Sequence, residues 1–91
     1  MAKHTIITIL KPTELEHDVY IMNAEGKLSH PPVKVKMDDL HKTLFSLAEK
    51  ENCEVVKLYG PDKYVSGVKK TLEKDLKTKY LNLKLKIEIG S

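Results

Sequence analysis

The second half of the chain predicts a strand, a helix and another strand in direct succession. Residues 54–59 form a short apolar run that Gly60 and Pro61 end, and residues 62–80 carry the period of one amphipathic helix. Residues 81–89 then alternate apolar and polar side chains, which is the period of a half-buried strand. Such a succession forms a parallel βαβ unit, and its right-handed crossover restricts the topology of the rest. The apolar residues of the last strand should share one face: Leu81, Leu83, Leu85, Ile87 and Ile89.

The first half of the chain predicts three further strands. Residues 5–10 are a β-branched run with apolar side chains on both sides of the pleat, which indicates a central strand. A polar connection over residues 13–17 leads to a second strand over residues 18–23. Residues 27–36 resume extended structure, and the proline pair within them places this third strand at an edge, because proline cannot donate a ladder hydrogen bond.

The apolar spacing predicts two helices. The first should begin near Met37, where Asp38 and Asp39 can cap free backbone amides, and should end near Asn52. Its apolar stripe consists of Leu40, Leu44, Leu47 and Ala48. The stripe of the second helix consists of Tyr64 or Val65, Val68, Leu72, Leu76 and Tyr80.

Length and composition indicate one globular domain, residues 1–91. Apolar residues make up 41% and charged residues 32% of the chain. No stretch approaches the roughly 18 apolar residues of a membrane span, so we expect no membrane partner. The single cysteine, Cys53, has no disulfide partner within the chain, which is typical of a cytoplasmic protein. Its place between a helix and a strand favours the role of a small buried hydrophobe.

The basic residues argue against sequence-specific reading of nucleic acid. The net charge is +3, and all 16 basic residues are lysines. The sequence contains no arginine, whose planar fork binds guanine edges and phosphates in a bidentate manner. A net charge of this size affects solubility and does not by itself indicate a nucleic-acid partner.

The order β-β-β-α-β-α-β resembles the ribonuclease H-like fold over nearly the whole chain. The resemblance implies an α/β domain with a five-stranded mixed sheet of order 3-2-1-4-5 in which strand 2 is antiparallel to the others. Both crossovers then run in the same direction, which places the two helices on one face. The run VVKLYGPDKY, an apolar strand that ends in Gly-Pro before a helix, is also similar to a turn in the middle domains of peptide-release factors.

Nuclease chemistry in that superfamily needs carboxylates that converge on two divalent ions. The resemblance implies an aspartate inside the first strand, another at the end of the fourth strand and a glutamate in the first helix. Here residues 5–10 contain no acid, and Asp62 lies beyond the proline that follows the fourth strand. Only Glu49 or Glu51 is available in the helix. We therefore expect no catalytic residue, no metal and no cofactor.

Two other groups of residues carry metal-compatible or catalytic atoms. Four such residues are close in sequence, but no helix or paired spacing organises them, so a solvated turn is favoured: Glu14, Glu16, His17 and Asp18. The histidines are scattered and accompany no nucleophile motif: His4, His17, His30 and His41. Neither group predicts an active site.

The sharper functional inference concerns the sheet face opposite the helices. The sequence supplies no element to cover it, so we expect an apolar and aromatic centre, with Tyr20, Met22 and Tyr59, inside a rim of lysines. The first strand contributes one of two pairs to this face, Ile6 with Leu10 or Ile7 with Ile9. The residues expected to bind a partner are Tyr20, Met22, Lys57, Tyr59, Lys84 and Lys86.

This surface favours a non-enzymatic protein-interaction module, such as a small homodimer, an adaptor or an inhibitor. The alternative is a module that binds RNA or single-stranded DNA, stacks bases on Tyr20 and Tyr59, and follows phosphates with its lysines. The second alternative is a divalent-metal nuclease of the ribonuclease H-like superfamily. The salt dependence of binding distinguishes the first two classes. Binding to phosphates weakens steeply as the salt concentration rises, whereas binding through an apolar protein interface hardly changes.

Overall fold

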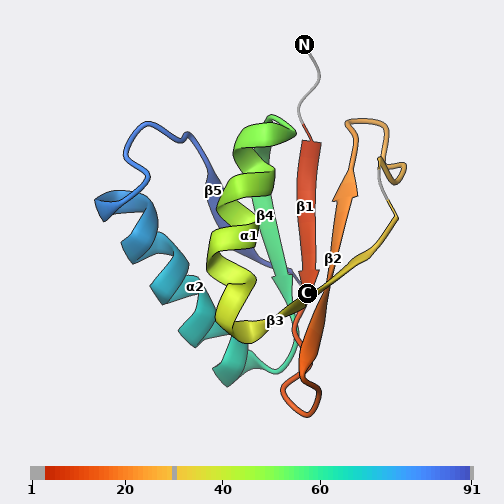
Figure 1. The fold of residues 1–91 in the computed structure, drawn as a ribbon, viewed down its shortest axis with the longest axis vertical. Coiled ribbons are helices and arrows are strands. Elements are labelled where there is room, and N and C mark those ends of the chain that lie inside the picture. Colours follow the sequence, from red (N-terminus) through yellow and green to blue (C-terminus); the bar gives the residue numbers. More distant parts are fainter. Residues whose placement is uncertain (1–3, 30, 91) are drawn as a thin grey trace.

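The computed structural model describes residues 4–29 and 31–90, so the expectation for His30 lies outside the described residues. It contains five strands and two helices in the order predicted from the sequence (Figure 1). Their bounds are β1 (His4–Ile9), β2 (Glu16–Met22), β3 (Val33–Lys36), α1 (Met37–Lys50), β4 (Cys53–Tyr59), α2 (Asp62–Thr78) and β5 (Lys86–Ile89).

The sheet has the predicted order β3-β2-β1-β4-β5. β2 is antiparallel to its neighbours β1 and β3, whereas β1, β4 and β5 run parallel to one another. Both helices lie on the same face of the sheet (Figure 1). The α/β class, the strand order and the helix placement expected from the sequence are therefore confirmed.

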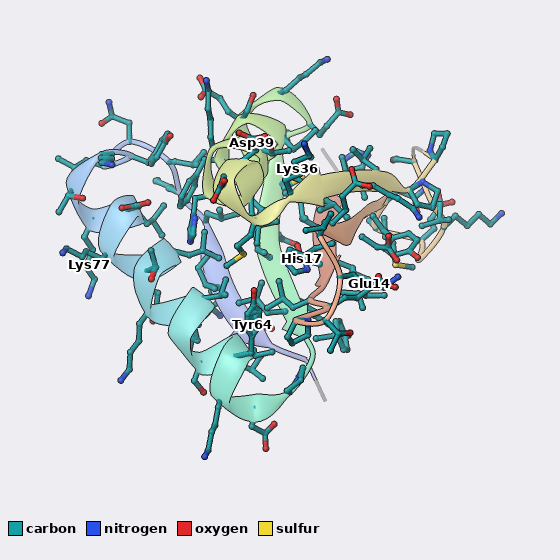
Figure 2. The ribbon with its side chains drawn as sticks, turned by 60° about the horizontal axis from the view of Figure 1, so that its bottom comes forward. Glu14, His17, Lys36, Asp39, Tyr64 and Lys77 are labelled. Atoms are coloured by element: carbon teal, nitrogen blue, oxygen red, sulfur yellow. The ribbon has the colours of Figure 1, made fainter. Side chains whose placement is uncertain are left out.

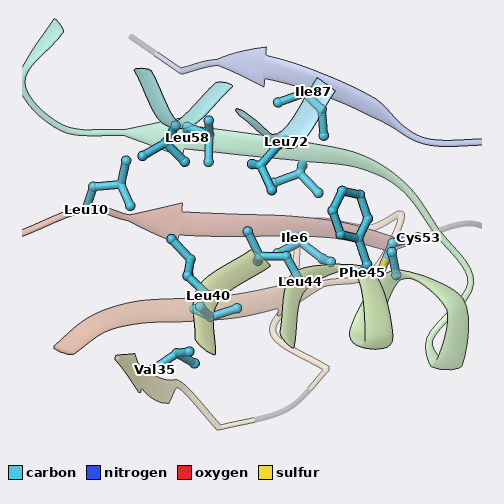
Figure 3. Close-up of a cluster of buried hydrophobic side chains, with 14 of the residues drawn as sticks. Ile6, Leu10, Val35, Leu40, Leu44, Phe45, Cys53, Leu58, Leu72 and Ile87 are labelled. Carbon is cyan, nitrogen blue, oxygen red and sulfur yellow. The ribbon is translucent and has the colours of Figure 1, made fainter. Parts of the chain in front are cut away.

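The hydrophobic core lies in one layer between the sheet and the two helices (Figure 3). Ile6 and Leu10 of the first strand segment point into it, which leaves Ile7 and Ile9 for the opposite face. From the helices the core takes Leu40, Leu44, Phe45, Ala48, Val65, Val68 and Leu72. Phe45 is absent from the stripe expected for the first helix, yet it is fully buried and its ring stacks on Tyr80 with the ring centroids 4.2 Å apart.

The last strand is shorter than predicted, four residues in place of nine. Val55 pairs with Lys86, so in this register residues 81–83 would have to pair with residues 50–52, which belong to the end of α1 and the following turn. No strand is available there, and residues 81–85 form a loop instead. The expectation that five apolar residues share a core face is wrong, because Leu81 is 75% exposed and Ile89 is 47% exposed.

The second and third strands also differ from the prediction at their ends. β2 begins at Glu16, so the expected polar connection over residues 13–17 is wrong for its last two positions. β3 is confined to Val33–Lys36, and among the described residues 27–29 upstream of the prolines Leu28 forms an isolated bridge to Met22. The edge position expected for this strand is confirmed.

The ends of the two helices agree only in part with those predicted from the sequence. α1 ends at Lys50, and Asn52 adopts a left-handed φ of 52°, as its place after a helix predicts. The expected capping role of Asp38 and Asp39 is wrong, since the N-terminus of α1 has no side-chain cap hydrogen bond. Both acids remain in the first turn, where they complement the helix dipole. α2 ends at Thr78, two residues before the predicted end.

Two polar side chains, Thr8 and His17, are buried in this core. The Lys11 backbone N–H donates to His17 Nδ1 at 2.8 Å, and the imidazole lies 6.0 Å from the Tyr64 ring, centroid to centroid (Figure 2). Because Nδ1 accepts this hydrogen bond, the ring is neutral, and its burial lowers the pKa of His17 below the usual value. The hydroxyl of Thr8 has no hydrogen-bond partner among the described residues.

Acid should destabilise the protein through His17. In the unfolded chain this side chain has a pKa of about 6.5, and burial holds the folded pKa lower, so the unfolded state takes up a proton first as the pH falls. The stability that depends on neutral His17 is complete above about pH 6.5 and is lost as the pH falls toward the folded pKa. Urea unfolding on both sides of that pH measures the loss. His17→Asn offers an oxygen acceptor that does not titrate and should show a smaller change with pH; an equal change would contradict the assignment.

Removing the unpartnered hydroxyl of Thr8 should stabilise the protein. Thr8→Val keeps the shape of the side chain and removes the cost of burying a hydroxyl without a partner, so the free energy of unfolding should rise by about 1 kcal/mol. Thr8→Ser keeps the hydroxyl, removes a buried methyl group and should lower it by about 1 kcal/mol. Chemical denaturation measures both, and a destabilised valine variant would show that the hydroxyl has a partner in solution.

Candidate functional site

The candidate site is the sheet face that points away from the helices, called the open face here. In the described part of the chain, no helix or strand packs on it. The strand residues that alternate with the core positions form it: Thr5, Ile7, Ile9, Glu16, Asp18, Tyr20, Met22, Lys34, Lys36, Val55, Lys57, Tyr59, Lys86 and Glu88. The members from β1, β2 and β4 are half-buried, except for the exposed Glu16.

Register places Ile7 at the centre of the open face. Ile7 lies opposite Tyr20 on β2 and opposite Lys57 on β4. In the adjacent row, Thr5 lies between Met22 and Val55. Ile7, Tyr20, Met22 and Val55 therefore make the middle of the face largely apolar and aromatic, and Lys57 borders it on β4.

Charged residues flank that centre in cross-strand pairs of opposite sign. On the β2–β3 side Glu16 is opposite Lys36 and Asp18 is opposite Lys34; on the β4–β5 side Lys57 is opposite Glu88. Oppositely charged residues that face each other across strands attract and reduce the local net charge. The open face thus has an apolar centre between two margins of mixed sign.

One margin is reinforced by an ion pair at the end of β1. Lys11 Nζ lies 2.7 Å from Asp18 Oδ2 and 3.4 Å from Glu14 Oε2. Hydrogen bonding to Lys11 lowers the pKa of Asp18, and the same contact raises the pKa of Lys11. The solvated turn expected for this region is wrong for Glu16, His17 and Asp18, which belong to β2. His17 is buried on the core face, whereas the neighbouring Asp18 points to the open face. The four residues therefore do not converge on one site.

Tyr59 lies at a corner of the open face. It is the last residue of β4, and a side chain at position 90 would collide with the Tyr59 ring, so this ring packs on the backbone of Gly90. On the other side Tyr59 lies opposite Ile9, in the row next to the one that contains Ile7 and Tyr20.

The open face brings together five of the six residues expected to bind a partner: Tyr20, Met22, Lys57, Tyr59 and Lys86. Lys84 precedes β5 and reaches the same side of the molecule in a shallow hollow with Val55 and Glu88. The sequence reading did not include Ile7 in the binding set, although Ile7 is the central residue. Once Ile6 and Thr8 are known to point into the core, the alternation of side chains along β1 places Ile7 on the open face.

The described residues do not assemble a catalytic centre of the nuclease type. Within residues 4–29 and 31–90, no three His, Cys, Asp or Glu side chains are placed to hold a metal ion together. Asp62 begins α2 at the C-terminal end of β4, whereas Glu49 lies near the end of α1, at the opposite end of that strand. Cys53 is 5% exposed, as expected for a structural thiol, and burial raises its pKa to about 11. No helix in the described ranges is long and apolar enough to span a membrane.

Comparison with known proteins identifies the fold. No family model and no curated protein matches the chain. Among solved structures, it is similar to a Bacteroides thetaiotaomicron protein described as having an actin-like ATPase fold and unknown function, with a TM-score of 0.62 and 17% sequence identity. The match covers 97% of this chain and 32% of that protein, so the chain spans about a third of its length. At this level of identity the likeness concerns the fold alone.

The arrangement of the acids predicts no divalent-metal nuclease activity. The purified protein should leave an RNA–DNA hybrid intact in the presence of Mg²⁺ or Mn²⁺, because its first strand supplies no carboxylate and its remaining acids do not converge. Gel analysis of a labelled hybrid measures this directly, with Asp62→Ala as the matched variant. Metal-dependent cleavage that the variant abolishes would overturn the prediction.

Proposed function

We propose that this chain is a non-enzymatic protein-binding module whose open face packs against another protein, with a second copy of the chain as the partner. The observation that supports this most is the anatomy of the face: an apolar centre around Ile7 and Tyr20, flanked on two sides by charge pairs. Protein interfaces have the same arrangement, with an apolar core and a polar rim.

The size of the face suits a specific contact. Five strands about 4.8 Å apart, with an average length of about six residues at about 3.4 Å per residue, give a footprint of about 500 Å². A standard interface buries roughly 800 Å² of accessible surface on each partner, and the accessible area of a side-chain layer exceeds its flat footprint. A second sheet of the same chain would match this footprint and could pack face to face at about 10 Å, as in β-sandwiches.

The charges on the open face favour a protein over nucleic acid. Three lysines, Lys34, Lys36 and Lys57, each lie directly opposite a carboxylate-bearing residue. Phosphates following these lysines would also meet Asp18, Glu16 and Glu88, and the repulsion would offset part of the attraction. A surface that carries both signs can instead match itself in a two-fold symmetric pair, where each positive region meets a negative one.

The test is the oligomeric state of matched lysine variants. Tyr20→Lys and Ile7→Lys place a charge in the centre of the open face and should weaken self-association by about 2 kcal/mol, which is about 30-fold in Kd. Leu81→Lys makes a comparable change at a position that is 75% exposed in the β5-side loop and should leave association unchanged. Sedimentation over a range of concentrations, with circular dichroism to verify folding, measures both effects.

Two further arms make this proposal falsifiable. Leu72→Lys introduces a charge at a fully buried core position and should unfold the domain; if Tyr20→Lys unfolds in the same way, Tyr20 is a core residue and the proposal is wrong. A wild-type protein that stays monomeric at high concentration would also overturn it. Binding of an oligonucleotide that weakens steeply with salt and is lost in Tyr20→Lys would support the nucleic-acid alternative instead.

A further inference from the structure

A hollow lies beside the sheet edge formed by β3, between that strand and the outer flank of α1. Val33 and Leu47 supply apolar surface to it, and Thr43 and Ser46 of α1 line it as well. Figure 2 shows Lys36 and Asp39 where β3 passes into α1. Val33 is 45% exposed in this position, although its strand neighbour Val35 is buried. The hollow therefore has an apolar wall that the folded chain leaves open.

Lysines outnumber acids around the hollow, although Lys34 and Lys36 face Asp18 and Glu16 across the β2–β3 ladder. Four lysines line it, against two acids: Lys34, Lys36, Lys42 and Lys50 against Glu16 and Asp39. In the described part of the chain, the ion pairs are those of Lys11, and none of these four lysines lies within ion-pair distance of a carboxylate. The hollow therefore has an excess of positive charge.

The backbone of β3 adds a second kind of recognition. β3 pairs with β2 on one side and is the edge strand on the other, so its outer N–H and C=O groups have no strand partner in the described chain. Its four residues alternate, with Lys34 and Lys36 on the open face and the two valines on the helix-covered face. A strand added about 4.8 Å beyond β3 would extend the floor of the hollow and place alternate side chains in it.

We propose that the β3 edge binds an extended acidic segment of another protein by strand addition. Main-chain hydrogen bonds to β3 supply the pairing, and side chains at alternate positions supply the selection. Carboxylates on one side of the added strand meet Lys34 and Lys36 across the ladder, whereas apolar side chains on the other side meet Val33 and Leu47 in the hollow. The segment is thus an alternating acidic and apolar sequence.

A second copy of this chain does not fit the same edge. Pairing two β3 edges would bring Lys34 and Lys36 of one copy against the same lysines of the other, and lysines on an edge strand hinder such pairing. We therefore assign the segment to a different protein. It uses the outer edge of β3, whereas the open-face dimer uses the apolar centre around Ile7 and Tyr20, and Lys34 and Lys36 border both surfaces.

The probe is a synthetic heptapeptide, acetyl-Glu-Val-Glu-Val-Glu-Val-Glu-amide, titrated into the isotope-labelled full chain. NMR shifts should be confined to β3 and the facing side of α1, and the Kd should rise as salt rises. The double variant Lys34→Glu with Lys36→Glu should raise the Kd about tenfold or more. Lys77→Glu reverses the charge of an exposed side chain on α2, which Figure 2 shows far from Lys36 and Asp39, and should change the Kd less than about twofold.

Peptide methylation separates strand addition from simple charge attraction. A paired strand points alternate amides toward its neighbour, so N-methylation of one alternate set should abolish binding and methylation of the other set should not. The proposal is overturned if both methylated peptides bind like the parent, if a peptide with lysine in place of glutamate binds equally well, or if the shifts fall elsewhere. A uridine heptanucleotide that competes as strongly as the peptide would also overturn it, because the hollow would then accept any anion.

Discussion

The two crossover connections, from β3 through α1 to β4 and from β4 through α2 to β5, both run toward the β5 edge of the sheet. A right-handed crossover that keeps its direction returns to the same side of the sheet each time, so the two helices share one face. The core is consequently a single layer. The opposite face keeps the side chains of five strands without a described element above them, and the candidate site depends on this arrangement.

β1 serves both surfaces at once. Its even-numbered side chains, Ile6 and Thr8, enter the core, whereas its odd-numbered ones, Ile7 and Ile9, form the middle of the open face. Because side chains alternate with a period of two, a slip of one residue would exchange the two sets. The pairing of β1 with β2 and β4 therefore determines both the stability of the core and the composition of the open face.

Local patterns predicted the element order, the edge position of β3 and the left-handed geometry of Asn52, since each follows from a few adjacent residues. Features that depend on a distant partner were not predictable in the same way. Residues 81–83 continue the alternation of a strand, but in the register of β5 they have no strand to pair with. His17 is a polar residue in the sequence, yet the fold buries it. The central place of Ile7 similarly needed the register of three strands, which residue periodicity does not specify.

The single cysteine can report local opening of the fold. Cys53 is the first residue of β4, just after the turn that follows α1, and it is buried. Burial raises its pKa to about 11, so the thiol is protonated at neutral pH. A thiol reagent can modify it only when this junction separates, so the rate of modification under native conditions measures how often the first crossover opens. Because Cys53 is the single cysteine, no other thiol contributes to that rate.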